Sequence, residues 1–234
     1  MHSYVDREKL AQLFLAEVTL FEELHPESAK LHAKAQGPLM AGVPMSWMAK
    51  WPGPHPVYVA SAKGSRFTDV DGIEYVDFCL GDTGAMVGHS PDASIKAIKE
   101  QLDKGITFML PTEDAAIVAK TLADRFGVPK WQFTLTATDA NRHILRYARH
   151  VTGKSKVVVH DYCYHGTVDE TFAVLDESGN TISRENNIGP QVDPSFTTIV
   201  VPFNDLAAAE KAFETGEVAA MLIEPAMTNI GIVL

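Results

Sequence analysis

Apolar positions near the start of the chain recur with the spacing of a helix. Leu10, Leu13, Phe14, Val18, Phe21 and Leu24 lie mostly three or four positions apart between residues 6 and 24, which places their side chains on one helical face. Pro26 follows and predicts a stop for that helix. Residues 37–56 then contain eight glycines and prolines, so we expect an irregular connector there.

Short β-forming runs follow the connector. Residues 57–60, 66–70 and 74–78 are such runs, and the dipeptides at 63–64 and 71–72 between them end in glycine and favour turns. This pattern predicts a small antiparallel meander.

Beyond residue 91, helical and strand patterns alternate. Helices are predicted at 93–103, 113–126, 139–151 and 206–213, and strands at 131–135, 156–160, 197–201 and 219–223. Strands that alternate with helices form βαβ units, so we expect an α/β fold with a mostly parallel sheet and helices on both faces. We place a domain boundary between residues 88 and 89, with the N-terminal helix, connector and meander before it.

Composition and charge exclude several classes of protein. The chain of 234 residues has a formal net charge of −10 and no cluster of Lys and Arg, which argues against a nucleic-acid partner. Its first ten residues are polar, and no later run is apolar for long enough to span a membrane, so we predict a cytoplasmic protein with no membrane partner. Cys79 and Cys163 lie far apart without the spacing of metal ligands, and no metal site is predicted.

The segment QFTLTATDAN, residues 132–141, suggests a site for an anion. A β-rich run meets three small residues, Thr136, Ala137 and Thr138, and a helical pattern begins after them. Thr136 and Asp139 match a capping box, and the free N–H groups of such a helix start can bind phosphate. Taken alone, the segment is more typical of a capped helix after a strand, and further motifs are needed to favour a binding site.

Two further strand ends carry polar or aromatic groups. Tyr164 and His165 follow the strand predicted at 156–160, while Glu224 and Asn229 follow the strand predicted at 219–223. Ligands of parallel sheets bind at the carboxyl ends of strands. An aromatic residue that packs on the sheet, and a solvated strand end, are the alternative interpretations.

Five segments in the same order resemble the class III aminotransferases, which are pyridoxal-phosphate enzymes of fold type I and include glutamate-1-semialdehyde aminomutase. The segments are RFTDVDGIEYVDF, GAMVGHSPD, TATDAN, CYHG and EPAMTNIG, and the resemblance covers the chain from Gly42 onward. It implies that residues 89–234 form the first half of a cofactor-binding large domain. Residues 1–88 would contribute to a smaller domain.

The resemblance also implies roles for individual residues. Thr136, Ala137 and Thr138 would hold the phosphate of pyridoxal 5'-phosphate, and Tyr164 would stack on its ring with His165 beside it. Four residues would lie on the substrate side, namely Trp47, Asp82, Glu224 and Asn229. The family further implies a homodimer with active sites near the subunit interface.

The sequence departs from the family pattern at three places. Ala137 replaces a glycine before the phosphate-binding threonine, and Tyr162 replaces a glycine before the CYHG run. Where aminomutases place an arginine that reads a substrate carboxylate, this chain has Met45, Trp47 and Met48. We therefore expect a substrate with an apolar portion that faces these three side chains.

The predicted activity is the transfer of an amino group between an amine or amino acid and an oxo acid. The lysine that forms the Schiff base is expected downstream of Leu234, so the chain is interpreted as an N-terminal part without a catalytic lysine. An aminomutase or ammonia-lyase using the same cofactor, and a non-catalytic cofactor-binding half-protein, remain as alternatives. A nucleotide binder using Gly81, Gly84 and Gly88 is disfavoured because G-x-G-x-x-G spacing is absent.

Overall fold

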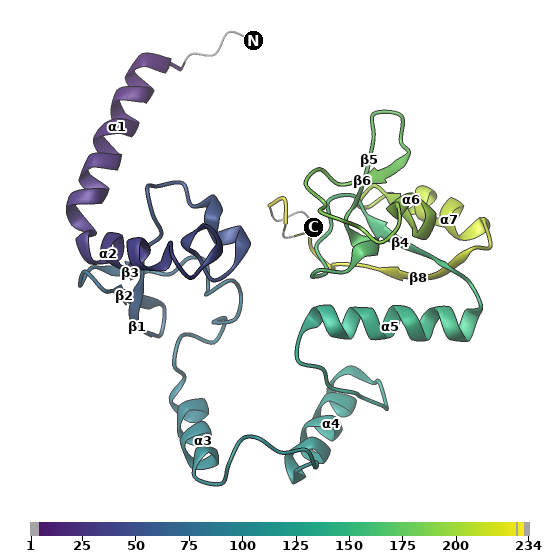
Figure 1. Cartoon of the computed structure of the whole chain (residues 1–234). Helices are drawn as coiled ribbons and strands as arrows, with labels where there is room; N and C mark the ends of the chain where they lie inside the picture. The colour runs from purple at the N-terminus through teal and green to yellow at the C-terminus, as the bar shows by residue number, and fades with distance from the viewer. Residues whose placement is uncertain (1–4, 228, 232–234) are drawn as a thin grey trace. The chain divides into compact units, whose positions relative to one another are not determined.

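The protein forms two compact units, one within residues 1–110 and the other within residues 111–234 (Figure 1). The structure is a computed structural model that describes residues 5–227 and 229–231. Residues 1–4, part of the polar start used above as a sequence signal, lie outside the described residues. The boundary between residues 88 and 89 stays a prediction.

The first unit begins with two consecutive helices. α1 (Arg7–Leu24) starts at Asp6, whose carboxylate accepts the backbone N–H groups of Glu8 and Lys9 at 3.1 and 3.0 Å. The predicted stop is confirmed, but the apolar pattern missed that Pro26 also opens α2 (Pro26–Ala35). Proline suits the first helical position because the N–H group that it lacks would have no intrahelical acceptor.

The connector and meander follow as expected, with shifted ends. The connector contains two short 3-10 helices, η1 (Met40–Gly42) and η2 (Ser46–Lys50). β1 (Val59–Lys63), β2 (Arg66–Asp69) and β3 (Glu74–Val76) form an antiparallel sheet in the order β1-β2-β3. α3 (Asp92–Leu102) is the last helix of this unit.

A buried polar network joins the helices to the meander. The Tyr75 hydroxyl donates to the Asp69 carboxylate at 3.0 Å and lies 2.6 Å from Nε2 of His25. Burial and the hydrogen bond to Asp69 raise the pKa of Tyr75 to about 12. The network therefore fixes the junction of α1 and α2 against β2 and β3.

The second unit is a layered α/β structure. Its helices are α4 (Glu113–Phe126), α5 (Ala137–Thr152), α6 (Pro194–Thr197) and α7 (Leu206–Glu214). Its three parallel strands, β4 (Lys156–His160), β7 (Thr198–Val201) and β8 (Val218–Leu222), lie in the order β7-β4-β8. In this register Val158 lies opposite Ile199 on β7 and Met221 on β8.

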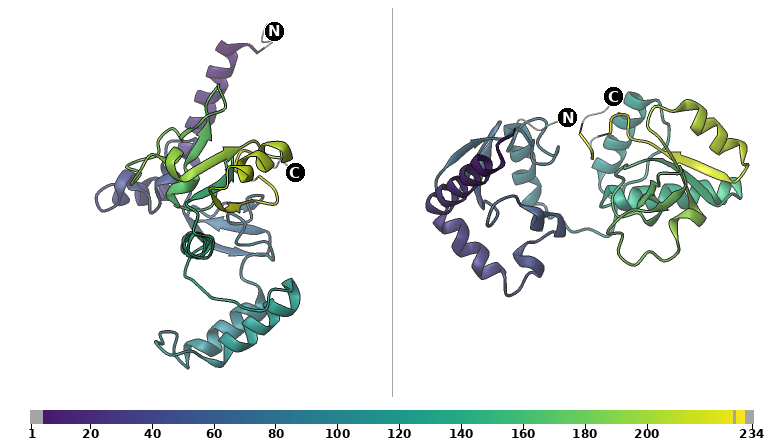
Figure 2. Two further views of the ribbon diagram at one scale, coloured as in Figure 1. Left: turned by 90° about the vertical axis from the view of Figure 1, so that its right-hand side faces the viewer. Right: turned by 90° about the horizontal axis from the view of Figure 1, so that it is seen from above.

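Helices cover both faces of this parallel sheet. Val157 and Val159 of β4 pack in one cluster with Leu145 of α5, whereas Val158 packs in a second cluster with Ala212 of α7. Because side chains alternate between the two faces of a strand, α5 and α7 lie on opposite faces of the sheet. Figures 1 and 2 show the same arrangement. The predicted arrangement of parallel strands between helices is confirmed.

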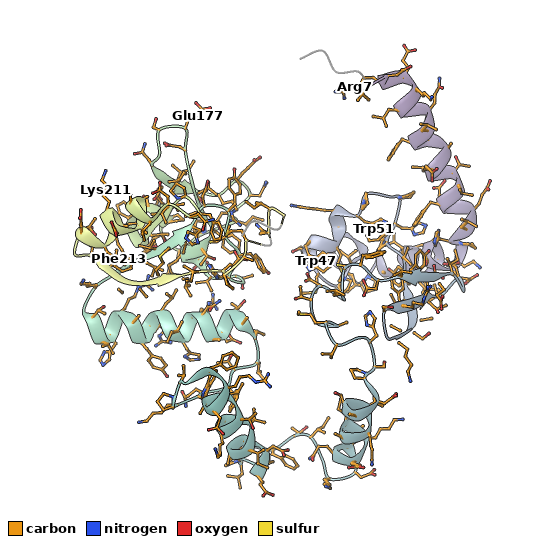
Figure 3. All side chains as sticks on the ribbon, turned by 180° about the vertical axis from the view of Figure 1, so that it is seen from behind. Arg7, Trp47, Trp51, Glu177, Lys211 and Phe213 are labelled. Atoms are coloured by element: carbon orange, nitrogen blue, oxygen red, sulfur yellow. The ribbon has the colours of Figure 1, made fainter. Side chains whose placement is uncertain are left out.

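Two parts of the second unit differ from the sequence prediction. Residues 131–135 form no strand, so that prediction is wrong. The strands described beside β4 are β7 and β8, and residues 131–135 have no neighbour with which to build a ladder. The pattern also missed η3 (Asp169–Thr171) and an antiparallel hairpin of β5 (Ala173–Leu175) and β6 (Thr181–Ser183), whose turn carries Glu177 (Figure 3).

None of the helices in the described part of the chain is long and apolar enough to cross a membrane.

Candidate active site

The start of α5 has the predicted cap. The backbone N–H of Asp139 donates to the Thr136 hydroxyl at 3.1 Å, and this hydroxyl donates to the Asp139 carboxylate at 2.9 Å. Ala137 is the first helical residue and does not belong to the described residues with positive φ, so alanine is unstrained where the family has glycine. The N–H groups of Ala137 and Thr138 have no intrahelical acceptor and are available to an anion.

A loop at the carboxyl end of β4 carries the predicted aromatic residue. Tyr164 is an exposed residue, with an exposed fraction of 56 %, whereas the neighbouring His165 is only 8 % exposed. Tyr162, which replaces a family glycine, has φ of +56°. A large residue in this left-handed region is strained. We call residues 162–167 the tethered loop, because side chains from elsewhere in the unit bond its backbone.

Two of these side chains follow β8. Oε2 of Glu224 accepts the backbone N–H of Tyr164 at 2.9 Å, and Nδ2 of Asn229 donates to the Tyr162 carbonyl at 3.1 Å. Glu224 and Asn229 were predicted to lie on the substrate side, and their hydrogen bonds hold the loop that carries Tyr164. Both residues therefore lie at the same sheet edge as the aromatic ring.

The other end of the tethered loop is fastened to α5. Nδ2 of Asn141 donates to the His165 carbonyl at 2.9 Å, and the backbone N–H of Thr167 donates to the Thr138 hydroxyl at 3.1 Å. Gly166 between them has φ of +79°, and a Cβ there would overlap the Thr138 hydroxyl oxygen and lie 3.1 Å from Thr138 Cα. Glycine is thus required for the loop to approach the first turn of α5 this closely.

Two residues that fasten the tethered loop, Asn141 and Arg184, were not predicted from the sequence. Asn141 lies in the TATDAN segment, where its position one turn after Ala137 on α5 was a usable signal. Arg184 follows β6 and donates from Nη2 to the Cys163 carbonyl at 2.7 Å. Nothing in the local sequence around Arg184 indicates this long-range contact.

Burial favours the neutral forms of three ionisable side chains in or beside the tethered loop. Desolvation lowers the pKa of His165, and the negative charge of Glu224 opposes that shift. Desolvation likewise lowers the pKa of His160 at the end of β4, again opposed by Glu224. Burial raises the pKa of the Cys163 thiol to about 12, so it is not a thiolate at neutral pH. Nδ1 of His160 and Nε2 of His165 are buried and without a hydrogen-bond partner among the described residues.

These shifts predict how acid affects the unit. Because the pKa of His165 is below its unfolded value, the stability that neutral His165 contributes is present above about pH 6.5 and is lost as pH falls toward the folded pKa. Glu224→Gln keeps an acceptor for Tyr164 but removes the charge, so we expect the pKa of His165 to fall further. NMR titration of the histidine ring in the full-length protein measures it.

Glu217→Gln is the control for this prediction, since Glu217 pairs with Lys156 at 3.0 Å and precedes β8 at its opposite end. It should leave the pKa of His165 unchanged. A pKa that rises or stays constant in Glu224→Gln contradicts the assignment.

The two remaining predicted residues lie in the first unit. Trp47 is an exposed residue of η2, and Trp51 follows the end of this helix (Figure 3). Asp82 lies in a turn in which four consecutive residues, 80–83, have positive φ. The Asp77 carboxylate holds this turn by accepting the N–H groups of Cys79 and Gly81 at 2.8 and 2.9 Å. The substrate-side roles of Trp47 and Asp82 stay predictions.

Within the second unit the structure brings together the other predicted residues, which are Thr136, Ala137, Thr138, Tyr164, His165, Glu224 and Asn229. Their arrangement, a helix N-terminus beside an exposed aromatic ring at the carboxyl edge of a parallel sheet, is typical of a site for a phosphorylated planar ligand.

Comparison with known proteins identifies the family. Residues 47–234 match the family model described as aminotransferase class-III. The chain belongs to the class III aminotransferase family.

Relatives of known structure or curated sequence agree with this assignment. A crystal structure of a glutamate-1-semialdehyde aminomutase from Pseudomonas aeruginosa is 47 % identical, with a TM-score of 0.92 over 98 % of this chain and 51 % of that chain. An omega-transaminase from Sphaerobacter thermophilus is 30 % identical, with a TM-score of 0.78 over 88 % of this chain and 49 % of that chain. These structures confirm the predicted α/β fold of type I.

The curated relatives carry the aminomutase name. The glutamate-1-semialdehyde 2,1-aminomutase of Methanocaldococcus jannaschii is 35 % identical over 213 residues, which are 89 % of this chain and 49 % of that protein. The chain spans about half the length of the curated relatives it matches. A lysine-to-alanine variant of the Pseudomonas protein was solved in complex with PMP, and another relative is a transaminase with PLP bound. The family assignment and these ligand-bound relatives confirm the prediction of pyridoxal phosphate as cofactor.

Proposed function

We propose that this chain supplies the pyridoxal-phosphate site of an enzyme that transfers amino groups between an amine or amino acid and an oxo acid. The observation that carries the proposal is the close approach of Gly166 to Thr138. It holds the loop that carries the exposed Tyr164 against the first turn of α5.

The residues present fit this cofactor. Ala137 and Thr138 offer backbone N–H groups to a phosphate, and the N-terminus of α5 favours its negative charge. Tyr164 offers an exposed ring face for stacking, and Nε2 of the neutral His165 is a buried polar atom without a partner among the described residues. When bound, the cofactor supplies an electron sink for the bonds at the substrate Cα and carries the amino group.

The chain's own residues would bind and orient this group. The first turn of α5 holds the phosphate, and Tyr164 fixes the plane of the ring. Glu224 and Asn229 keep Tyr164 in place through the backbone bonds described above. Burial of His165 keeps its ring uncharged beside the site.

Two reactions of this class have separate support. The aminomutase name of the 47 % identical Pseudomonas protein favours an intramolecular amino shift. Met45, Trp47 and Met48, at the place where aminomutases carry a carboxylate-reading arginine, favour transfer from an amine or amino acid with an apolar portion.

Reconstitution of the full-length protein distinguishes these reactions. The protein is incubated with pyridoxal phosphate, filtered through a gel column and scanned for visible absorbance. Amino transfer requires an oxo acid acceptor, whereas an aminomutase isomerises glutamate-1-semialdehyde without one and an ammonia-lyase releases ammonia. Reduction with borohydride and peptide mapping identifies the lysine to which the cofactor attaches. A protein that retains no cofactor contradicts the proposal, and one that retains it without turnover favours the non-catalytic alternative.

Tyr164 gives a direct test of the cofactor site. Stacking of planar rings contributes on the order of 1 kcal/mol, so Tyr164→Ala should weaken retention of pyridoxal phosphate more than Tyr164→Phe, which keeps the ring. Equilibrium dialysis of the full-length variants measures the dissociation constants. Tyr147→Ala, which removes an exposed tyrosine of α5, is the control and should bind normally. Equal dissociation constants for the two Tyr164 variants would exclude this residue from the site.

We further propose a homodimer. The first helix exposes apolar side chains, among them Leu10, Leu13 and Phe14, and such a surface favours association. Sedimentation of the full-length protein tests the oligomeric state.

A further inference from the structure

The guanidinium group of Arg184 contacts the tethered loop and the neighbouring Phe172 ring. Its Nη2 donates to the Cys163 carbonyl at 2.7 Å, and its guanidinium carbon lies 5.9 Å from the centre of the Tyr162 ring and 6.0 Å from that of Phe172. Distances of this size are typical of cation–π contacts. One side chain therefore holds both the ring of Tyr162 and the next carbonyl.

The hairpin fixes the position from which Arg184 reaches the loop. The backbone N–H of Arg184 donates to the Phe172 carbonyl at 2.8 Å, directly beyond the paired strands β5 and β6. The side chain is half-buried, and its Nε has no acceptor among the described residues. Arg184 is thus directed at the loop and not at solvent.

The conformation of Tyr162 explains why the loop needs this contact. Its φ of +56° is a strained value for a large side chain. Such a conformation persists only where the surrounding structure holds it. The Tyr162 ring that lies under Arg184 belongs to the strained residue itself, two positions before Tyr164.

We propose that Arg184 is a positioning residue, which holds Tyr162 in its left-handed conformation and thereby orients the ring of Tyr164. The part of this inference that concerns the cofactor rests on the proposed function. Arg184 acts through the loop backbone and does not itself take part in the chemistry.

Three variants of the full-length protein test this role. Arg184→Ala removes the hydrogen bond and the cation–π contact, while Arg184→Lys keeps a charge that can reach Cys163 but loses the planar group. Asn187→Ala is the control, because Nδ2 of Asn187 bonds Ser183 at 3.0 Å and Phe172 at 3.5 Å, within the hairpin and its base. It removes these two bonds but leaves the backbone bond of Arg184 to Phe172 and the bond of Arg184 to Cys163 in place.

Hydrogen exchange of the apoprotein is the first measurement. The backbone N–H groups of Tyr164 and Thr167 should exchange about tenfold faster in Arg184→Ala, since this variant loses the contact that holds the strained Tyr162 as well as the hydrogen bond to Cys163. Arg184→Lys should be intermediate, and Asn187→Ala should exchange at the normal rate. The dissociation constant for pyridoxal phosphate should rise about tenfold in Arg184→Ala. Normal exchange in Arg184→Ala, or an equal rise in Asn187→Ala, overturns the proposal.

A double-mutant cycle with Tyr162→Gly identifies the mechanism. Glycine adopts the left-handed conformation without strain and has no ring for Arg184 to contact. Only the hydrogen bond to Cys163 then remains to be lost, so adding Arg184→Ala to Tyr162→Gly should accelerate exchange only about two- to threefold. The same acceleration in both backgrounds would show that Arg184 does not act through Tyr162. If the unmodified protein retains no cofactor, the proposed function fails, whereas the exchange rates still decide the role of Arg184.

Discussion

Gly166→Ala is expected to raise the dissociation constant for pyridoxal phosphate about a hundredfold. The new Cβ would overlap the Thr138 hydroxyl oxygen at a residue whose φ is +79°. The strained backbone and the forced displacement together cost roughly 3 kcal/mol, which corresponds to about two powers of ten. Equilibrium dialysis of the full-length protein measures the effect, and the melting temperature should fall as well.

Gly179→Ala is a matched control for this prediction. Gly179 has nearly the same φ, +80°, but a Cβ there meets nothing within 4 Å. Its replacement should cost only the backbone strain, about 1 kcal/mol, and leave cofactor affinity unchanged. If both alanine variants bind equally well, the close approach of the loop to α5 is not needed for binding.

Leu145→Ala should produce the largest loss of stability in the second unit. Leu145 is 2 % exposed and is the one buried residue of α5 among the described residues. Removal of a leucine from such a site costs about 3 kcal/mol, because a cavity remains between α5 and the sheet. Thermal or chemical unfolding of the full-length protein measures the loss.

Ile144→Ala provides the comparison on the same helix, since Ile144 is 53 % exposed. Its effect should remain below about 1 kcal/mol. A similar loss in both variants would mean that α5 is not held to the sheet by Leu145.

Local signals predicted most of the elements. The helix at 113–126 has the predicted ends, and so does the strand at 156–160. The helix begins directly after Thr112, a residue type that favours helix N-caps, and the centre of the strand is buried in the sheet. In each case the local pattern agrees with the surroundings of the element. The capped start of α5 could also be predicted, because Thr136 and Asp139 lie within one turn of each other.

Elements that depend on distant partners were harder to predict. Residues 131–135 have a β-forming pattern, but a strand needs a neighbour, and the described sheet offers none beside them. The hairpin at 173–183 has strands of three residues each, too short to show a period. Tyr162 stands where the family has a glycine, and its positive φ explains why glycine suits this position.

The residues of the candidate site that lie in sequence motifs were predicted, whereas those that reach the site only through tertiary contacts were not. The resemblance marked Glu224 and Tyr164 separately. Their hydrogen bond joins residues that lie 60 positions apart, and no spacing rule in the sequence connects them. Arg184 has no motif at all, and only the fold brings it to Cys163.

The wide sequence separation of the bonds that fasten the tethered loop determines when this loop can become ordered during folding. Asn141, Arg184, Glu224 and Asn229 reach it across separations of 21 to 67 residues. Each bond can form only after the chain between its two residues has closed into a loop, and the entropic cost of that closure comes before the bond stabilises the structure. The tethered loop therefore becomes ordered late, after α5, the hairpin and β8 have docked. A ligand that recognises only the ordered loop stabilises the final stage of folding and slows unfolding, without speeding the first collapse of the chain.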